Sequence, residues 1–122
     1  MKINKFENIE SWKRSRGLVN LVYNSTFEYP FNKDFGLRDQ IQRASVSIMS
    51  NIAEGFDSGT NKSFINFLNY AYRSASEVQS LLYVASDLKY ISIKQFDAMY
   101  NHSTEIKKLI GGFIQYLKRT KN

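Results

Sequence analysis

The residues with the clearest chemistry in this sequence are lysines and arginines, whose cationic groups bind phosphate. Residues 107–122 carry five of them and no acid, and residues 1–16 carry five against two glutamates. The stretch between them holds nine acids and seven bases, so the net charge of +6 comes from the two ends of the chain. We predict that both ends contribute to a nucleic-acid-binding surface. Its predicted residues are Lys13, Arg14, Lys107, Lys108, Lys118, Arg119 and Lys121.

A second explanation of the basic C-terminal end requires no ligand. Cationic side chains in the last turns of a helix interact favourably with the helix dipole, by roughly a few tenths of a kcal/mol each. On this interpretation Lys118 and Arg119 belong to a solvated helix end. Both explanations are open at the level of sequence.

Residues suited to catalysis are sparse. His102 is the only histidine and there is no cysteine, so a zinc site with several such ligands is excluded. We expect Glu54 and Glu77 to form structural ion pairs with Arg43 or Arg73, because neither glutamate has a histidine nearby in sequence. The glycine-rich phosphate loops and the G-x-S-x-G nucleophile motif are also missing. We therefore predict no enzymatic activity, no cofactor and no metal.

Four amphipathic segments must position these groups. We predict helices over about residues 9–29, 35–56, 61–89 and 93–119, in a single domain spanning 1–122, because apolar residues recur at steps of three and four. The faces of the first two are Ile9, Trp12, Ser15, Val19, Val22 and Thr26, then Leu37, Ile41, Ala44, Ile48 and Ile52. Those of the last two are Phe64, Leu68, Ala71, Ala75, Val78, Leu82 and Ala85, then Phe96, Met99, Ser103, Ile106, Ile110, Phe113 and Leu117.

Short connections between the segments favour an all-α, antiparallel up-down-up-down four-helix bundle. Pro30 ends the first segment, and Asp34 is the predicted N-cap of the second. Such a bundle places the start of the first helix and the end of the fourth at one pole, so we expect the two basic ends to converge there. Gly111 and Gly112 interrupt the fourth helix at a cost of roughly 1 kcal/mol each, which indicates close helix contact or a local bend.

The sequence also favours a cytoplasmic protein that does not enter a membrane. Its N-terminus has no apolar region typical of a signal peptide, and no apolar stretch approaches the ~20 residues needed to span a bilayer. The lack of cysteine fits a reducing compartment.

Apolar residues outside the predicted core faces suggest self-association. Such residues are covered either by the edge of the core or by another subunit, and a bundle of this size has no thick core. We expect an oligomer interface, with the edge of the core as the alternative. The residues assigned to the interface are Leu18, Leu21, Tyr70, Leu81, Val84 and Leu88.

The second predicted helix carries a motif that resembles the proteins encoded in intervening sequences of bacterial 23S rRNA genes, also called S23 ribosomal proteins. The family pattern R-A-x-x-S-I-x-x-N-I-A-E-G is matched by Arg43, Ala44, Ser47, Ile48, Asn51, Ile52, Ala53, Glu54 and Gly55. Weaker matches elsewhere extend the resemblance over nearly the whole chain. We interpret Arg43, Asn51, Glu54, Gly55 and Glu77 as residues that specify the fold.

The resemblance implies a four-helix fold and a ring-like homo-oligomer, commonly a pentamer. It also implies kinship with accessory proteins of diversity-generating retroelements, which bind nucleic acid and a reverse transcriptase. Our leading hypothesis is a non-catalytic homo-oligomer that binds nucleic acid, RNA ahead of DNA, through the basic pole. The alternative is a protein-interaction scaffold or accessory subunit with no nucleic-acid affinity of its own.

Overall fold

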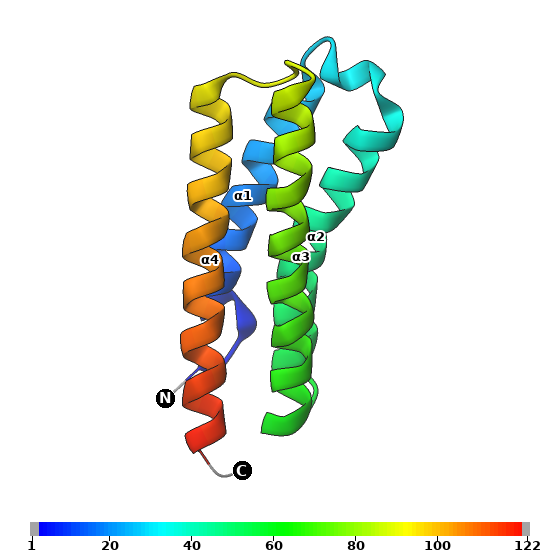
Figure 1. The fold of residues 1–122 in the computed structure, drawn as a ribbon. Coiled ribbons are helices and arrows are strands. Elements are labelled where there is room, and N and C mark those ends of the chain that lie inside the picture. The colour runs from blue at the N-terminus through cyan, green and yellow to red at the C-terminus, as the bar shows by residue number, and fades with distance from the viewer. Residues whose placement is uncertain (1–2, 121–122) are drawn as a thin grey trace.

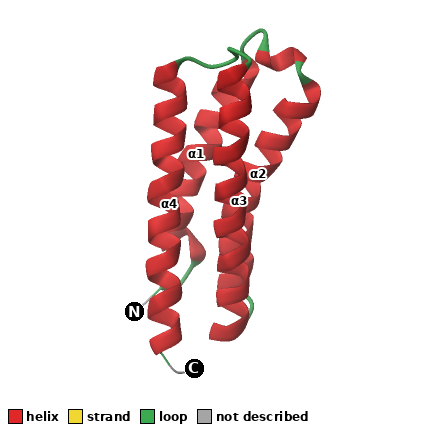
Figure 2. Ribbon diagram, in the orientation of Figure 1, coloured by secondary structure: helices red, strands yellow, loops and turns green. Residues whose placement is uncertain are grey.

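The computed structural model describes residues 3–120, and this part of the chain is helical without any strand (Figure 2). The long helices alternate in direction along the bundle, as predicted for an antiparallel four-helix fold (Figure 1). They are α1 (Glu10–Phe27), α2 (Phe35–Phe56), α3 (Asn61–Asp87) and α4 (Ile93–Arg119). Two one-turn 3-10 helices, η1 (Phe6–Asn8) and η2 (Phe31–Lys33), precede α1 and α2.

Side-chain caps fix the starts of three long helices. The predicted cap of α2 is confirmed, because the Asp34 carboxylate accepts a hydrogen bond from the Leu37 amide at 3.2 Å. The Thr60 hydroxyl accepts from the Ser63 amide at the start of α3. At the start of α4, Ser92 and Gln95 form a reciprocal capping box.

The first helix is shorter than predicted. It ends at Phe27 rather than at residue 29, and the chain then turns through Tyr29 and Pro30 into η2. Proline disfavours the α conformation in the residue before it, and this restriction brings the helix to an end ahead of the proline.

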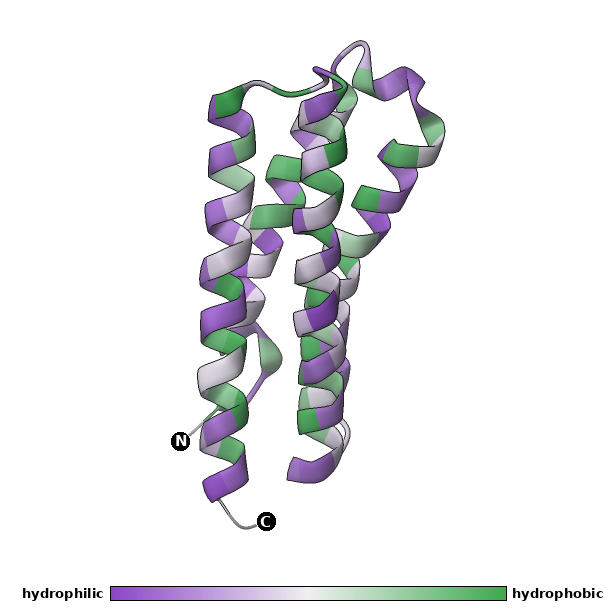
Figure 3. Ribbon diagram, in the orientation of Figure 1, coloured by the Kyte–Doolittle hydropathy of each residue, from purple (hydrophilic) through white to green (hydrophobic). Residues whose placement is uncertain are grey.

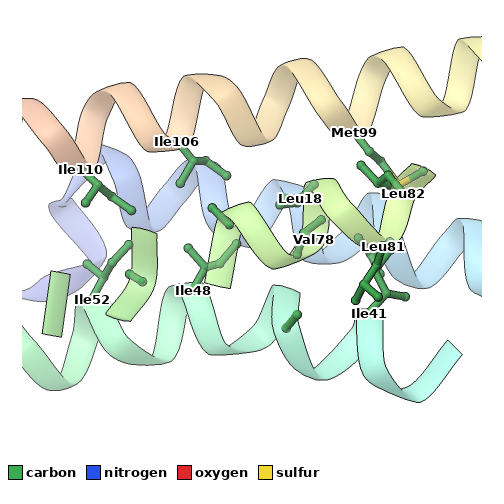
Figure 4. Close-up of a cluster of buried hydrophobic side chains, with 14 of the residues drawn as sticks. Leu18, Ile41, Ile48, Ile52, Val78, Leu81, Leu82, Met99, Ile106 and Ile110 are labelled. Carbon is green, nitrogen blue, oxygen red and sulfur yellow. The ribbon is translucent and has the colours of Figure 1, made fainter. Parts of the chain in front are cut away.

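The core consists of the predicted faces of α2, α3 and α4. Every residue assigned to the faces of α2 and α3 is buried. In α4 the core positions are buried except Phe96 and Phe113, which are half-buried and pack against the core. Figure 4 shows these side chains meeting between the helices, with Ile48 and Ile52 of α2 opposite Ile106 and Ile110 of α4.

The predicted face of α1 is correct in part, because Ile9, Ser15, Val22 and Thr26 are buried as predicted. Leu18, assigned to an oligomer interface, is completely buried in the bundle, so that prediction is wrong. Val19 and Trp12, assigned to the core, are only half-buried. Ser11, Leu18 and Ser25 complete the inner face, and the weak hydrophobicity of the two serines gave no sign of their burial. Ser15 is satisfied there because its hydroxyl donates to the Ser11 carbonyl.

A second interface prediction also fails. Leu81 is only 9% exposed and lies beside Ile41 and Leu82 in the core, because it widens the inner face of α3 (Figure 4). Leu21 is half-buried against the core. Tyr70, Val84 and Leu88 are 51%, 42% and 50% exposed, so they remain on the outer side of α3, here called its outer stripe, which also carries Arg73 and Glu77.

Hydropathy alternates around each helix, with hydrophilic residues at the end of α4 (Figure 3). None of the helices in residues 3–120 combines the length and hydrophobicity needed to cross a membrane.

Helices α2 and α3 meet along a tightly packed line, here called the α2–α3 seam, defined by Gly55, Ser47 and Ser74. The Ser74 hydroxyl donates to the Ser47 hydroxyl at 3.0 Å. A Cβ atom added to Gly55 would lie 2.7 Å from the Phe67 Cβ and 2.8 Å from Cδ1 of Phe64. Only glycine permits this approach of the two helices.

Candidate nucleic-acid interface

The predicted basic residues of α4 border a groove between α3 and α4. We define the α3–α4 groove by its lining residues, which are Tyr72, Gln79, Tyr100, Thr104, Lys107, Lys108, Gly111 and Gly112. The two helices run antiparallel beside each other, so residues near the middle of α3 face residues near the middle of α4 (Figure 1). The groove therefore combines ammonium groups, phenol rings and an open stretch of helix.

A buried glutamine holds one of these ammonium groups in place. Gln79 is only 7% exposed, and its amide donates to the Thr104 hydroxyl at 2.9 Å and to the Tyr100 carbonyl at 3.3 Å. Its carbonyl oxygen accepts a hydrogen bond from the Lys107 ammonium at 3.1 Å. The same ammonium lies 5.0 Å from the centre of the Tyr72 ring. Lys107 thus projects into the groove from a fixed position with a favourable cation–π contact.

The positive charge of the groove is not cancelled by acids. The ion pairs among the described residues join Arg14 to Glu10 at 3.4 Å and Arg38 to Asp39 at 2.9 Å. Lys107 and Lys108 are therefore outside ion-pair distance of any described carboxylate. Lys118 and Arg119 share this property and follow Lys107 and Lys108 in the same rows of α4, because eleven residues complete about three turns. Lys121 lies outside the described residues.

The two basic ends lie at one pole of the bundle as predicted (Figure 1), but they do not share one groove. Helix α1 contributes no residue to the α3–α4 groove. Lys107 lies near the middle of α4 rather than at the pole. Lys13 and Arg14 are exposed on α1, and Arg14 is paired with Glu10. The helix spacing was right, but Lys107 of α4 contacts Gln79 and Tyr72 of α3.

Aromatic residues extend the groove toward the start of α4. Tyr83, Phe96 and Tyr100 form a cluster in which the ring centres lie 5.0 to 5.8 Å apart. A hydrogen bond with Tyr100 is the main cause that raises the pKa of Tyr83. Sequence reasoning missed the tyrosines of the groove and Gln79. The sequence did contain a signal for these residues. Tyr72 and Gln79 are seven residues apart, as are Tyr100 and Lys107, so each pair lies on one side of its helix beside the core face.

The family motif on α2 contains both structural and exposed residues. Gly55 is structural, as predicted, and Asn51 donates to the Ser47 carbonyl at 2.9 Å within α2. Arg43 and Glu54 are exposed, so burial between helices does not support their interpretation as residues that specify the fold. They lie on one outer row of α2, since eleven residues separate them.

The predicted ion pairs of the glutamates are also absent from the described residues. Glu77 accepts a hydrogen bond from Gln40 of α2 at 3.3 Å instead of pairing with an arginine. The guanidinium of Arg73 lies over the Tyr70 ring, with 5.7 Å between its carbon and the ring centre. Long exposed side chains gain little from an ion pair in water, so these alternative contacts compete effectively.

The single histidine joins two helices. His102 Nε2 lies 2.7 Å from the Arg14 carbonyl oxygen, and because a carbonyl can only accept, the ring nitrogen donates. Gly17 faces the same ring, and an added Cβ would lie 3.2 Å from Nε2. His102 therefore ties α4 to α1. Across residues 3–120 no group of three or more histidine, aspartate or glutamate side chains is arranged to hold a metal ion.

Comparison with known proteins places these features in a family. A family model described as 23S rRNA-intervening sequence protein matches residues 7–112. The fold is similar to the 1.70 Å crystal structure of a protein with unknown function from the S23 ribosomal protein family of Bacteroides thetaiotaomicron, with a TM-score of 0.78 and 32% sequence identity. The match covers 86% of this chain and 95% of that one. The curated proteins contain no match to the chain.

Proposed function

The chain belongs to the family of 23S rRNA-intervening sequence proteins, and from this premise we propose that it is a non-catalytic RNA-binding protein. The α3–α4 groove and the basic end of α4 form the proposed binding surface. Lys107, Lys108, Lys118 and Arg119 supply the phosphate contacts. Lys13 and Arg14 are left outside this surface because they lie on α1.

One observation carries the proposal: four cationic side chains follow one side of α4, and no carboxylate of residues 3–120 lies at ion-pair distance from them. A merely solvated helix end explains Lys118 and Arg119, which lie in the last turn. It does not explain Lys107 and Lys108, which lie near the middle of α4. Clustered unpaired cations attract a polyanion, and phosphate neutralisation supplies most of the affinity in such interfaces.

We further propose that the protein acts as a homo-oligomer through the outer stripe of α3. Tyr70, Val84 and Leu88 fall on one side of this helix, and Tyr72 lies about 200° from Tyr70 around it. The outer stripe and the groove are thus on different sides of α3, so copies of the chain joined by the stripe keep their grooves accessible. Repetition of a weak site in this way raises the overall affinity.

The proposal is tested by fluorescence anisotropy with a fluorescent rRNA fragment at several salt concentrations. The variant Lys108→Glu/Lys118→Glu/Arg119→Glu reverses three exposed charges without touching the Gln79 contact. We expect saturable binding by the wild-type protein that weakens log-linearly with salt. The triple variant should bind at least 100-fold more weakly at low salt because phosphate attraction becomes repulsion.

The matched control is Lys33→Glu/Arg43→Glu/Lys94→Glu, which changes the net charge equally at exposed positions elsewhere. This control should keep most of the RNA affinity if the location of the charge matters. Equal loss in both variants would mean that the effect depends only on net charge. Failure of the wild-type oligomer to bind RNA at low salt would refute the proposal and favour a protein-interaction scaffold.

A further inference from the structure

Two glycines in α4 have no structural explanation within residues 3–120. A Cβ atom added to Gly111 or Gly112 would find no heavy atom within 4 Å. Neither glycine lies at a helix end, since α4 continues to Arg119, and neither has a positive φ. Glycine in a helix interior is less favourable than alanine because it loses more conformational freedom on folding. No packing contact among residues 3–120 compensates for this loss of stability.

The position of the glycines suggests what they serve. Gly111 follows Lys107 by one helical turn, and Gly112 follows Lys108 in the same way. All four residues line the α3–α4 groove. The backbone of α4 is thus uncovered by side chains next to two ammonium groups, and a ligand can contact it directly. A phosphodiester backbone fits such a surface, since it is negatively charged and gains from direct contact with backbone atoms and cations.

We infer that an unpaired RNA segment binds in the α3–α4 groove with its sugar–phosphate backbone directly against Gly111 and Gly112. This inference rests on the proposed RNA-binding function and specifies the form of RNA that the site accepts. Lys107 and Lys108 contact the phosphates on one side of the glycines, and Lys118 and Arg119 contact those on the other side.

The tyrosines of the groove favour an unpaired segment over a duplex. Tyr72 is 39% exposed, although the Lys107 ammonium lies 5.0 Å from its ring centre, and Tyr100 is half-buried at the other end of the lining. Unpaired bases stack on exposed aromatic rings, whereas bases in a duplex have their faces covered by their neighbours. Alternating cations and aromatic rings are typical of surfaces that bind single strands.

The test compares Gly111→Ala/Gly112→Ala with wild-type protein in two measurements. Urea unfolding should show a higher midpoint for the variant, because alanine favours the helix and meets no clash. Anisotropy titration with an unstructured 20-nucleotide RNA should show at least tenfold weaker binding, because two methyl groups hold the backbone away. Simultaneous gain of stability and loss of affinity excludes unfolding as the cause.

Gly36→Ala is the matched control. Gly36 is an exposed helical glycine whose added Cβ would meet only the Asp34 carboxylate oxygen at 3.9 Å. This variant should also gain stability but should bind RNA as wild type does. Tyr72→Ala provides a second arm and should weaken binding about tenfold, whereas Tyr72→Phe should retain it.

The outcomes separate this inference from the proposed function. Suppose that the double alanine variant binds RNA as tightly as wild type, while the charge-reversal variant does not bind. This result would overturn the inference and leave the proposed function standing. Equal or tighter binding of a blunt RNA duplex would also overturn it. A change in oligomer mass without a change in RNA affinity would assign the glycines to contacts between copies. Absence of any wild-type binding would overturn both proposals.

Discussion

The α2–α3 seam and the α3–α4 groove use the same residue type in opposite ways. At the seam, Gly55 lies so close to Phe64 and Phe67 that an added Cβ would come within 2.8 Å of both side chains. At the groove, Gly111 and Gly112 face open space. The first glycine is required by the fold, while the other two weaken the helix that contains them.

The polar groups of the two regions also differ: those of the seam bond within the chain, whereas those of the groove present a cation outward. At the seam the Ser74 hydroxyl donates to the Ser47 hydroxyl, which also accepts from the Asn51 amide, so these groups bond within the chain. In the groove, Gln79 is bonded to its neighbours but presents the Lys107 ammonium toward the outside. The comparison teaches that one side of α3 is closed by packing within the chain, whereas the other side keeps an open groove, on which the proposed RNA binding rests.

The largest expected effect comes from replacing the glycine of the seam. Gly55→Ala should lower the free energy of unfolding by about 1–3 kcal/mol, because its Cβ overlaps two phenylalanine side chains. Urea unfolding followed by far-UV circular dichroism measures this change. Gly111→Ala, as the contrasting variant, should raise the same free energy by up to about 1 kcal/mol. Changes of the same sign in both variants would contradict the comparison.

The next effect concerns the polar network beneath the groove. Gln79→Leu should lower the free energy of unfolding by about 1 kcal/mol, because it removes the hydrogen bonds that join α3 to α4. It should also weaken RNA binding severalfold, since Lys107 loses the group that fixes its position. The exposed neighbour Ser80, replaced by alanine, is the control and should leave both quantities nearly unchanged. Unaltered RNA affinity in Gln79→Leu would show that Lys107 needs no positioning.

A smaller effect is expected from the hydroxyl pair of the seam. Ser74→Ala should cost about 0.5–1 kcal/mol of unfolding free energy, because the Ser47 hydroxyl loses its partner across the helices. RNA affinity should stay at its wild-type value, since the seam lies outside the groove. A drop in affinity of this stable variant would mean that the two sides of α3 are coupled.

The smallest effect appears at alkaline pH. Hydrogen bonding with Tyr100 raises the pKa of Tyr83 above its usual 10.0, so the folded state favours the neutral phenol. The resulting contribution to stability is complete below the unfolded pKa and is lost as the pH rises through the folded pKa. Between about pH 9 and pH 11 the Tm of wild-type protein should therefore fall more than that of Tyr83→Phe. Parallel curves for the two proteins would refute the proposed role of this hydrogen bond.

Much of the fold was predictable because periodic burial leaves a direct trace in sequence. The core faces of α2 and α3 were identified completely, and the Asp34 cap was recognised from its type and place. The face of α1 was identified only in part because its buried positions include Ser11 and Ser25, which carry no hydrophobic signal. A buried serine can satisfy its hydroxyl within its own helix, as Ser15 does, so burial of this kind is not visible in composition.

The candidate site was predictable only in its charges. Sequence by itself determined the helices, their antiparallel order and the excess of cations near the end of α4, because these depend on local spacing and residue type. Tertiary structure alone decided that Lys107 faces Tyr72 and Gln79 of α3 rather than the basic start of α1. It also decided that Gly55 is enclosed while Gly111 and Gly112 are open. The physical reason is that the rotation of each helix about its axis follows from the packing of all its neighbours, and no single segment contains that information.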